Sequence, residues 1–248
     1  MPSVKELRSA TEAVDRIPNG SRIIASPACG TPTTLLKSLA ERSGGRSWEL
    51  STGLLLAHEA VADAIRRGDL AYRTWHVATP LGPLVEERLV SYVPLRASRT
   101  PAFVAASRPD VALVRVSPPD RNGWCNIGPS ASYVLAALEH SKLRIAEIDR
   151  GIPRLRGHSA VHVSDLDLLV ESLEARPVYL SAPETSESKA IARHVMDLLP
   201  PEPVLQLGIG AIPESLLAAL ADHGAGKLRF TGMVSDRMVD LAEKGLLD

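Results

Sequence analysis

The feature that most constrains this chain is the repeated alternation of short β-type runs with helical patterns. The apolar run Arg22–Ala25 is followed by Thr31-Pro32 and a helical pattern, and the same succession recurs toward the C-terminus. Strands are predicted at 22–25, 48–52, 73–78, 111–117, 143–148, 177–181, 204–207 and 227–231, and helices at 33–42, 58–67, 133–140, 187–198, 214–221 and 237–243. This alternation predicts an α/β fold with a mostly parallel sheet flanked by helices.

Composition argues against several classes of protein. The 248 residues are 45% hydrophobic and 23% charged, as in an ordinary globular chain. The 28 Lys and Arg residues nearly balance 29 Asp and Glu residues, so no overall positive field favours nucleic acid. Aromatic residues make up only 4%, which leaves few rings to stack on single strands. We therefore expect no nucleic-acid partner.

No segment predicts export or membrane insertion. Residues 1–18 contain no apolar stretch like that of a signal peptide, and the apolar run Leu54–Ala57 is far shorter than the ~20 residues of a spanning helix. The two cysteines, Cys29 and Cys125, are too few for a disulfide framework, and Cys125 is expected to be packed. We expect a cytoplasmic protein with no membrane partner.

The histidines do not predict a metal site. His158 and His162 have a spacing that would place both rings on one face of a helix, but the segment from Ser159 to Val163 has an extended pattern. No acidic or thiol ligand stands at a standard offset from them. A Ser-His-Asp triad stays open as an alternative, although the chain has no G-x-S-x-G elbow.

The sharpest local signal is the segment QLGIGAIPE, from Gln206 to Glu214. Glycines after a strand let backbone N–H groups converge, and the start of a helix adds positive potential. The segment therefore predicts a site for a phosphate, a carboxylate or a developing oxyanion. Its binding residues are predicted to be Gln206, Gly208, Ile209, Gly210 and Ala211. A tight turn without a ligand is an equally weighted alternative.

A second segment, Val116–Gly128, has two prolines and an Asn-Gly pair, which indicate an ordered loop after a strand or a surface hairpin. With other segments in the same order, it resembles the acetyl-CoA hydrolase/transferase family of class I CoA-transferases. The matching stretches are Ile17–Arg22 with Thr31-Pro32, Val116–Gly128, Ile145–Ile148, Ile152–Arg154, Gly157–Ser159, His162–Asp165 and Leu207–Pro213.

The resemblance implies a class I CoA-transferase-like fold and a ping-pong acyl transfer. Coenzyme A enters as an acyl-CoA substrate, a small acid or water is the acceptor, and no metal takes part. In the family a glutamate attacks the thioester, which divides a difficult step into easier ones. That glutamate lies in a strand after the glycine-rich loop, and the matching segment here is Arg229–Asp236. Gly232 occupies the nucleophile's position and has no side chain to attack with.

The resemblance also implies a division into domains. Residues 1–222 are expected to form an N-terminal α/β domain, and residues 223–248 are expected to begin a second, similar domain. Because an open sheet edge tends to be covered, we expect a second protein chain to supply the C-terminal half. The alternative is that this sequence is a fragment of a longer protein.

Two functions follow from these observations. The chain is either an acyl-CoA-processing subunit that works without a glutamyl intermediate, or a non-catalytic subunit that binds a CoA ester or completes a partner's fold. In the first case Glu214 or Asp236 is a candidate general base. The structural alternatives are a first-turn helix residue for Glu214 and an N-cap for Asp236. A sugar-phosphate isomerase-like protein, which shares the fold but not these motifs, is a third alternative.

Overall fold

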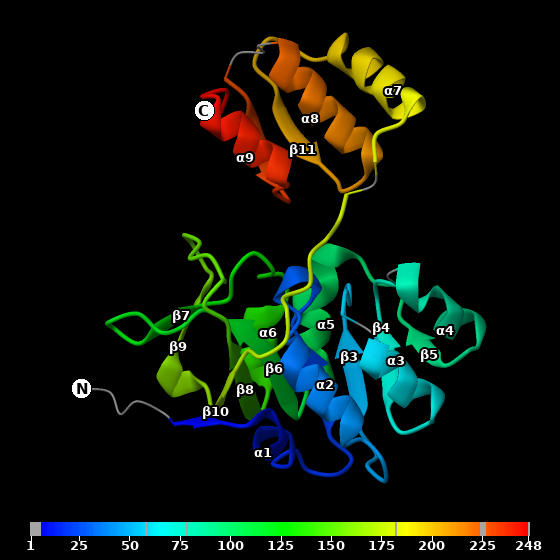
Figure 1. The fold of residues 1–248 in the computed structure, drawn as a ribbon, viewed down its shortest axis with the longest axis vertical. Helices are drawn as coiled ribbons and strands as arrows, with labels where there is room; N and C mark the ends of the chain where they lie inside the picture. The colour runs from blue at the N-terminus through cyan, green and yellow to red at the C-terminus, as the bar shows by residue number, and fades with distance from the viewer. Residues whose placement is uncertain (1–5, 58, 78, 182, 224–226, 248) are drawn as a thin grey trace. The chain divides into compact units, whose positions relative to one another are not determined.

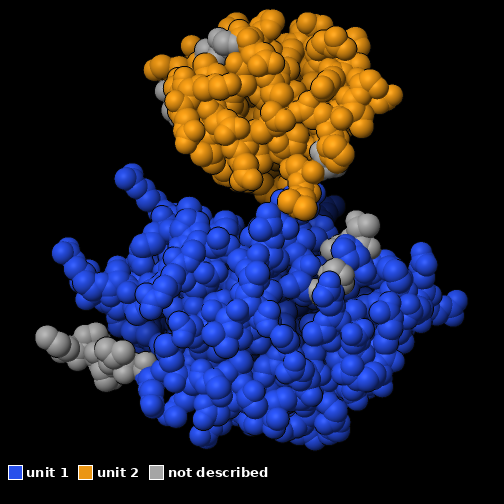
Figure 2. All heavy atoms as spheres, in the orientation of Figure 1, with its two compact units in different colours: residues 1–179 blue, residues 180–248 orange. Residues whose placement is uncertain are grey.

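The computed structural model describes residues 6–57, 59–77, 79–181, 183–223 and 227–247. The chain divides into two compact units, residues 1–179 and 180–248 (Figure 2). This division differs from the predicted one, which placed 180–222 with the first domain. The reason is a shared core: Ala192, Leu217, Leu228 and Leu241 pack in one apolar cluster of unit 2. His58 and Ala78, at the ends of a predicted helix and strand, lie outside the described residues.

Unit 1 is built on a parallel sheet, to which the described residues contribute eight strands (Figure 1). The strands are β1 (Leu7–Arg8), β2 (Arg22–Ala25), β3 (Glu49–Thr52), β4 (Ala71–Thr74), β5 (Val90–Tyr92), β6 (Val111–Val116), β8 (Leu143–Ile148) and β10 (Leu168–Glu171). Their order across the sheet is β1-β10-β8-β6-β2-β3-β4-β5, and each neighbouring pair is parallel. The predicted α/β fold is confirmed.

Helices cover both faces of this sheet, so its strands are apolar on both sides. In β2, Ile23 and Ala25 belong to one core cluster and Ile24 belongs to the other. The helices of unit 1 are α1 (Ala10–Val14), α2 (Thr33–Glu41), α3 (Glu59–Arg66), α4 (Gly82–Glu86), α5 (Thr100–Ser107) and α6 (Val134–His140). An antiparallel pair, β7 (Trp124–Asn126) and β9 (Ala160–His162), lies outside the main sheet. The extended pattern predicted over 159–163 is thus largely confirmed.

Unit 2 consists of a two-stranded parallel sheet and three helices within the described residues. Its elements are α7 (Ser186–Met196), β11 (Val204–Leu207), α8 (Ala211–His223), β12 (Arg229–Gly232) and α9 (Asp236–Glu243). The described part of the chain has no helix long and apolar enough to cross a bilayer. Nor does it bring three or more His, Cys, Asp or Glu side chains together in a group that could hold a metal ion.

The predicted strand at 177–181 is wrong. Residues 177–181 have neither strand nor helix in the structure, and Val178 and Leu180 are 68% and 83% exposed. A strand requires a neighbour for its backbone N–H and C=O groups, and none of the described strands pairs with this segment. The apolar pattern alone was therefore a misleading signal.

A buried ion pair joins the two central strands of unit 1. Arg115 of β6 and Glu147 of β8 are direct neighbours in the sheet, and both side chains are 0% exposed. The Arg115 guanidinium donates to Glu147 Oε1 from Nε at 3.2 Å and from Nη2 at 2.5 Å. Burial of both charges requires that their remaining hydrogen-bonding atoms also find partners.

Partners for most of these atoms come from two other segments, and Arg115 Nη1 is the one buried atom of the pair without a hydrogen bond among the described residues. Glu147 Oε2 accepts from the backbone N–H of Leu35 in the first turn of α2, at 3.1 Å. Ser172, just after β10, donates to Glu147 Oε1 at 2.8 Å. Arg115 Nη2 also donates to Thr33 Oγ1 at 2.6 Å. The pair thus fixes the start of α2 and the end of β10 against the middle of the sheet.

We predict that Arg115→Met destabilises unit 1 by about 3–5 kcal/mol, because it leaves the Glu147 carboxylate buried and unpaired. Trp48, Trp75 and Trp124, the three tryptophans, all lie in unit 1, so urea unfolding followed by tryptophan fluorescence reports on this unit. The double variant Arg115→Met/Glu147→Met should recover part of the loss.

The matched control is Arg66→Met, which removes an arginine from the exposed Arg66–Glu87 pair, whose closest atoms are 3.3 Å apart. Surface pairs contribute little, so its unfolding curve should stay close to that of the wild type. An Arg115→Met variant as stable as this control would contradict the assigned role of the buried pair.

Candidate functional site

Parallel pairing brings two loops together at one edge of unit 2. β11 and β12 are neighbours, and Leu207, the last residue of β11, pairs with Gly232, the last residue of β12. The loop 208–210 and the loop 233–235 therefore begin side by side at the carboxyl ends of the strands. In parallel α/β sheets this is the edge where ligands bind.

The glycine loop connects β11 to α8 with a backbone that favours glycine. Gly210 has φ +132°, a value that residues with a side chain rarely adopt. Pro213 is the third residue of α8, where its missing N–H costs no helical hydrogen bond. The preceding N–H groups have no acceptor inside the helix, and they form its positive end. Ile209 and Ile212 are 43% and 44% exposed, so the loop is open to solvent.

Gly232 lies directly beside Gln206. Gly232 has φ +94°, and a Cβ built on it would be 3.3 Å from Gln206 Cγ. A side chain at this position would therefore lie against the Gln206 amide and next to the start of the glycine loop. The structure thus brings together the two regions that the sequence analysis selected, the glycine loop and the segment that contains Gly232.

Glu214 is held in an ion pair that sequence reasoning missed. Its side chain is 10% exposed, its Oε2 lies 3.2 Å from Arg237 Nε, and its Oε1 accepts from Ser181 Oγ at 3.2 Å. Arg237 also donates to Glu184 Oε1 at 2.5 Å. Glu214 lies in the first turn of α8, as the structural alternative described. Arg237 and Glu184 are 53 positions apart, so no local pattern could have revealed their contact.

Asp236 occupies a different environment. It is the exposed first residue of α9, and Ser235 is the N-cap, although the Ser235 side chain makes no capping hydrogen bond. The N-cap predicted at Asp236 is thus displaced by one residue. A carboxylate in the first turn still complements the positive end of the helix.

The loop Val116–Gly128 in unit 1 is ordered by Asp120. Asp120 Oδ1 accepts from the backbone N–H groups of Asn122 and Trp124, both at 2.9 Å. The hydrogen bond from Trp124 is the largest cause that lowers the pKa of Asp120, and the nearby Arg154 guanidinium lowers it further.

Cys125 in this loop is 0% exposed, which confirms its predicted packing, and burial raises the pKa of its thiol to about 11.

The Ser-His-Asp alternative has a partial counterpart at the end of β9. His162 Nδ1 lies 2.7 Å from Ser164 Oγ, and its Nε2 lies 3.1 Å from the backbone oxygen of Asn122. Asp165, however, contacts Ser164 at 3.4 Å and not the imidazole. His162 also accepts from the Ser164 backbone N–H as the cap of a short 3₁₀ turn. The arrangement is a capped turn without the carboxylate–imidazole contact of a triad.

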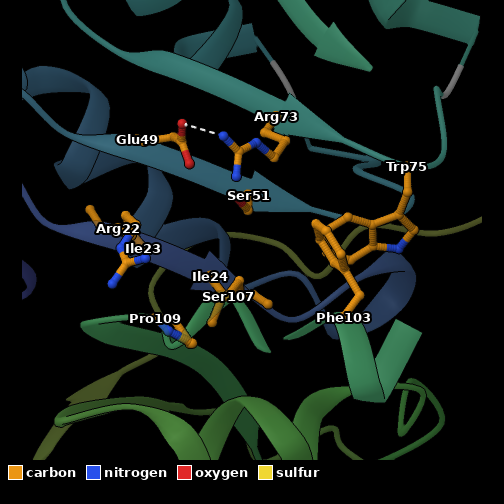
Figure 3. Close-up of a pocket in the computed structure, with 10 residues that line it drawn as sticks. All are labelled: Arg22, Ile23, Ile24, Glu49, Ser51, Arg73, Trp75, Phe103, Ser107 and Pro109. Carbon is orange, nitrogen blue, oxygen red and sulfur yellow. Dashed lines mark hydrogen bonds and ion pairs between the residues drawn. The ribbon is translucent and has the colours of Figure 1, made fainter. Parts of the chain in front are cut away.

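Two hollows in unit 1 differ in what they could hold. The first, on the sheet face beside α5, holds about 10 Å³, room for about one water. Figure 3 shows its lining, in which Arg73 donates to Glu49 at 3.0 Å. The second holds about 390 Å³ between the N-terminal ends of α2 and α3, with apolar Leu36 and Val61 in its wall. Its size suits a small ligand.

Comparison with known proteins assigns the family. Residues 2–178 match the model of the acetyl-CoA hydrolase/transferase N-terminal domain. The chain belongs to the acetyl-CoA hydrolase/transferase family. It is 31% identical to the 4-hydroxybutyrate coenzyme A transferase of Clostridium kluyveri, over 98% of this chain and 57% of that protein. It is 30% identical to the butyryl-CoA:acetate CoA-transferase of Anaerostipes caccae, over 97% of this chain and 56% of that protein.

A solved structure shares the fold of this chain. RipA from Yersinia pestis matches 98% of this chain and 59% of its own with a TM-score of 0.86 at 25% identity. The resemblance and the CoA-transferase-like α/β fold inferred from the sequence are both confirmed. The family member described here spans a little more than half the length of the curated relatives it matches.

We predict that Arg237→Met loosens the glycine loop, because Glu214 and Glu184 would lose their shared cation. Hydrogen exchange should become at least tenfold faster in the first turns of α8 and α9, while exchange in unit 1 stays unchanged. Arg193→Met, which removes an exposed arginine from α7, is the control. Unaltered exchange at residues 208–216 in Arg237→Met would contradict this role.

Proposed function

We propose that this chain processes a CoA thioester without a covalent glutamyl intermediate, and that a second chain carries the C-terminal half of the enzyme. The observation that carries the proposal is the pairing that places the glycine loop beside Gly232, the position where the family resemblance implies a nucleophile. Family membership supports a CoA thioester as the substrate class. The prediction of a cytoplasmic enzyme is part of this proposal.

The chemistry assigned to the glycine loop is stabilisation of an oxyanion. Water adds to the thioester carbonyl carbon, the carbonyl oxygen becomes negative, and the C–S bond then breaks to release CoA and the free acid. Donors aimed at such an oxygen each contribute on the order of 10²–10³ in rate. The N–H groups that precede Pro213, with Gly208 and Gly210 at the turn, are the donors we assign. The region beside Gly232 and Gln206 receives the attacking water. A small acid in the same place would instead form a mixed anhydride and release CoA thiolate, which then attacks the acid's own carbonyl carbon to give the new CoA thioester and the free original acid.

Asp236 is the better of the two candidate bases. Glu214 has both carboxylate oxygens occupied, by Arg237 and by Ser181. Asp236 is exposed, and it begins α9 directly after the loop that follows Gly232. A general base must reach the proton of the attacking water, so a carboxylate without such contacts is favoured.

The size of the cavity in unit 1, about 390 Å³, favours the binding of a small acyl group or a small acid. Leu36, Val61 and Leu56 supply apolar wall, and Lys37 supplies a cation that lies 2.6 Å from Glu174. An apolar pocket with few polar groups is the common form of a small-molecule site. No metal enters the proposed reaction.

A non-catalytic role is the second candidate, and Gly232 is the observation that favours it. A glycine cannot form the acyl-enzyme that the resemblance implies, so the chain would then bind a CoA ester for its partner or complete the partner's fold. Turnover distinguishes the two functions.

We predict that the chain, purified from its own cells with its partner, releases CoA from butyryl-CoA without acylating itself. A thiol reagent should report CoA release, with and without added acetate, while intact-mass analysis should show no adduct on this chain. Asp236→Asn should lower the rate by about 10²-fold or more. Asp240→Asn, an exposed carboxylate on the same helix, is the control. A glutamyl adduct would contradict the proposed mechanism, and CoA-ester binding without turnover would favour the non-catalytic role.

We predict that Gly232→Glu creates a covalent acyl-CoA cycle if the remaining site is complete. The φ of +94° strains any side chain at this position, so Gly232→Gln is the matched control, with equal strain and no nucleophile. The Glu variant should form a mass adduct with butyryl-CoA and transfer the acyl group to acetate, and the Gln variant should do neither. Equal behaviour of the two variants would show that the site cannot support a glutamate.

A further inference from the structure

Two loops of unit 1 form one surface at the carboxyl edge of its sheet. β6 and β8 are parallel neighbours, and their last residues, Val116 and Ile148, pair directly. The loops 117–124 and 149–158 therefore begin side by side. Arg154 joins them, because its guanidinium donates to Asp120 Oδ2 at 3.1 Å and to the backbone oxygen of Trp124 at 3.0 Å.

This surface carries an excess of positive charge. The two loops hold four arginines against two aspartates, although the whole chain has a net charge of -1. Asp120 is paired with Arg154, and Asp149 lies 3.7 Å from Arg176. The remaining three arginines, Arg121, Arg150 and Arg156, are exposed and make no ion pair within the described residues. We refer to these three residues as the arginine edge.

An exposed aromatic ring lies in the same surface. Trp124 is 45% exposed, whereas Trp48 and Trp75 are 1% and 9% exposed. Its backbone is fixed on both sides, by Asp120 and by Arg154, and its ring contacts His162 edge-on with centroids 5.2 Å apart. An aromatic ring held in place at the surface is a stacking platform for a nucleobase.

Arginine and tryptophan side chains together favour a ligand that carries both phosphate groups and an aromatic ring. The planar guanidinium matches phosphate oxygens in a bidentate manner, and uncompensated like charges on one surface attract an anion. A purine can stack on Trp124 while its phosphates contact the arginine edge. Inorganic anions would use only the charges and would not need the ring.

We propose that Trp124 and the arginine edge bind the adenosine-phosphate end of CoA. This inference rests on the proposed function only for the identity of the ligand, since the surface itself would recognise any adenosine bearing several phosphates.

The test uses the full chain and two probes, CoA and adenosine 3′,5′-bisphosphate. Titration calorimetry should measure the affinity of every variant, and binding should weaken as salt rises. In proteins that keep Trp124, titration should also quench its fluorescence. R121Q/R150Q/R156Q should weaken binding of both probes at least tenfold, and Trp124→Leu should do the same. Pantetheine, which lacks the nucleotide, should bind all proteins equally. Circular dichroism and thermal unfolding should show that both variants remain folded.

The matched control is R16Q/R96Q/R99Q, which removes three other exposed arginines that form no ion pair among the described residues. Its affinity should stay within about twofold of the wild type, because only non-specific attraction is lost. Equal losses in the two triple variants would overturn the proposal, as would absence of bisphosphate binding by the wild type.

Binding of the wild type to phosphatidylserine vesicles, lost in R121Q/R150Q/R156Q without any nucleotide binding, would also overturn the proposal in favour of a membrane surface. Failure of acyl-CoA turnover with intact bisphosphate binding would contradict the proposed function alone. The two proposals therefore fail through different measurements.

Discussion

The buried pair of Arg115 and Glu147 is the interaction on which the carboxyl edge of unit 1 depends. Removing two charges from water costs several kcal/mol per ion unless hydrogen bonds replace the lost hydration. Glu147 meets that requirement with donors from three elements, including the Leu35 backbone and Ser172. Apolar residues of equal volume could fill the same space, but they would not orient the start of α2 or the end of β10. The directionality of these bonds therefore fixes the place from which the loops after β6 and β8 begin.

The elements that the sequence predicted well are those whose burial is local and periodic. The strands at 22–25, 143–148 and 204–207 match the structure residue for residue, because apolar, β-branched runs leave little choice of element. The strands Leu7–Arg8 and Val90–Tyr92 were not predicted, since pairing defines such short segments more than composition does. At the candidate site the glycine pattern revealed the loop. The Glu214–Arg237 contact could not be predicted, because it depends on how α8 and α9 pack.

The backbone conformation of Gly232 bears on the proposal that this position carries no nucleophile. A φ of +94° is a conformation that costs a residue with a side chain of order 1–3 kcal/mol and costs glycine much less. Glycine is therefore the residue that the backbone of β12 accepts with least strain at its end. A glutamate at this position would have to be held there by the rest of the site. The backbone at the end of β12 is therefore compatible with the proposed mechanism, in which no side chain at this position attacks the thioester.

In the proposed site, the ion pair of Arg237 with Glu214 affects the electrostatic potential at the glycine loop. An unpaired carboxylate in the first turn of α8 would oppose any anion bound at that helix end, because both would compete for the same positive potential. Glu214 is instead paired with Arg237, which also holds Glu184. The charge of Glu214 is thereby compensated, so that in the proposed reaction the N–H groups before Pro213 keep their attraction for an oxyanion. The ion pair and the glycines consequently act together in the proposed site. The ion pair neutralises the charge of Glu214, and the glycines let a ligand approach the backbone N–H groups.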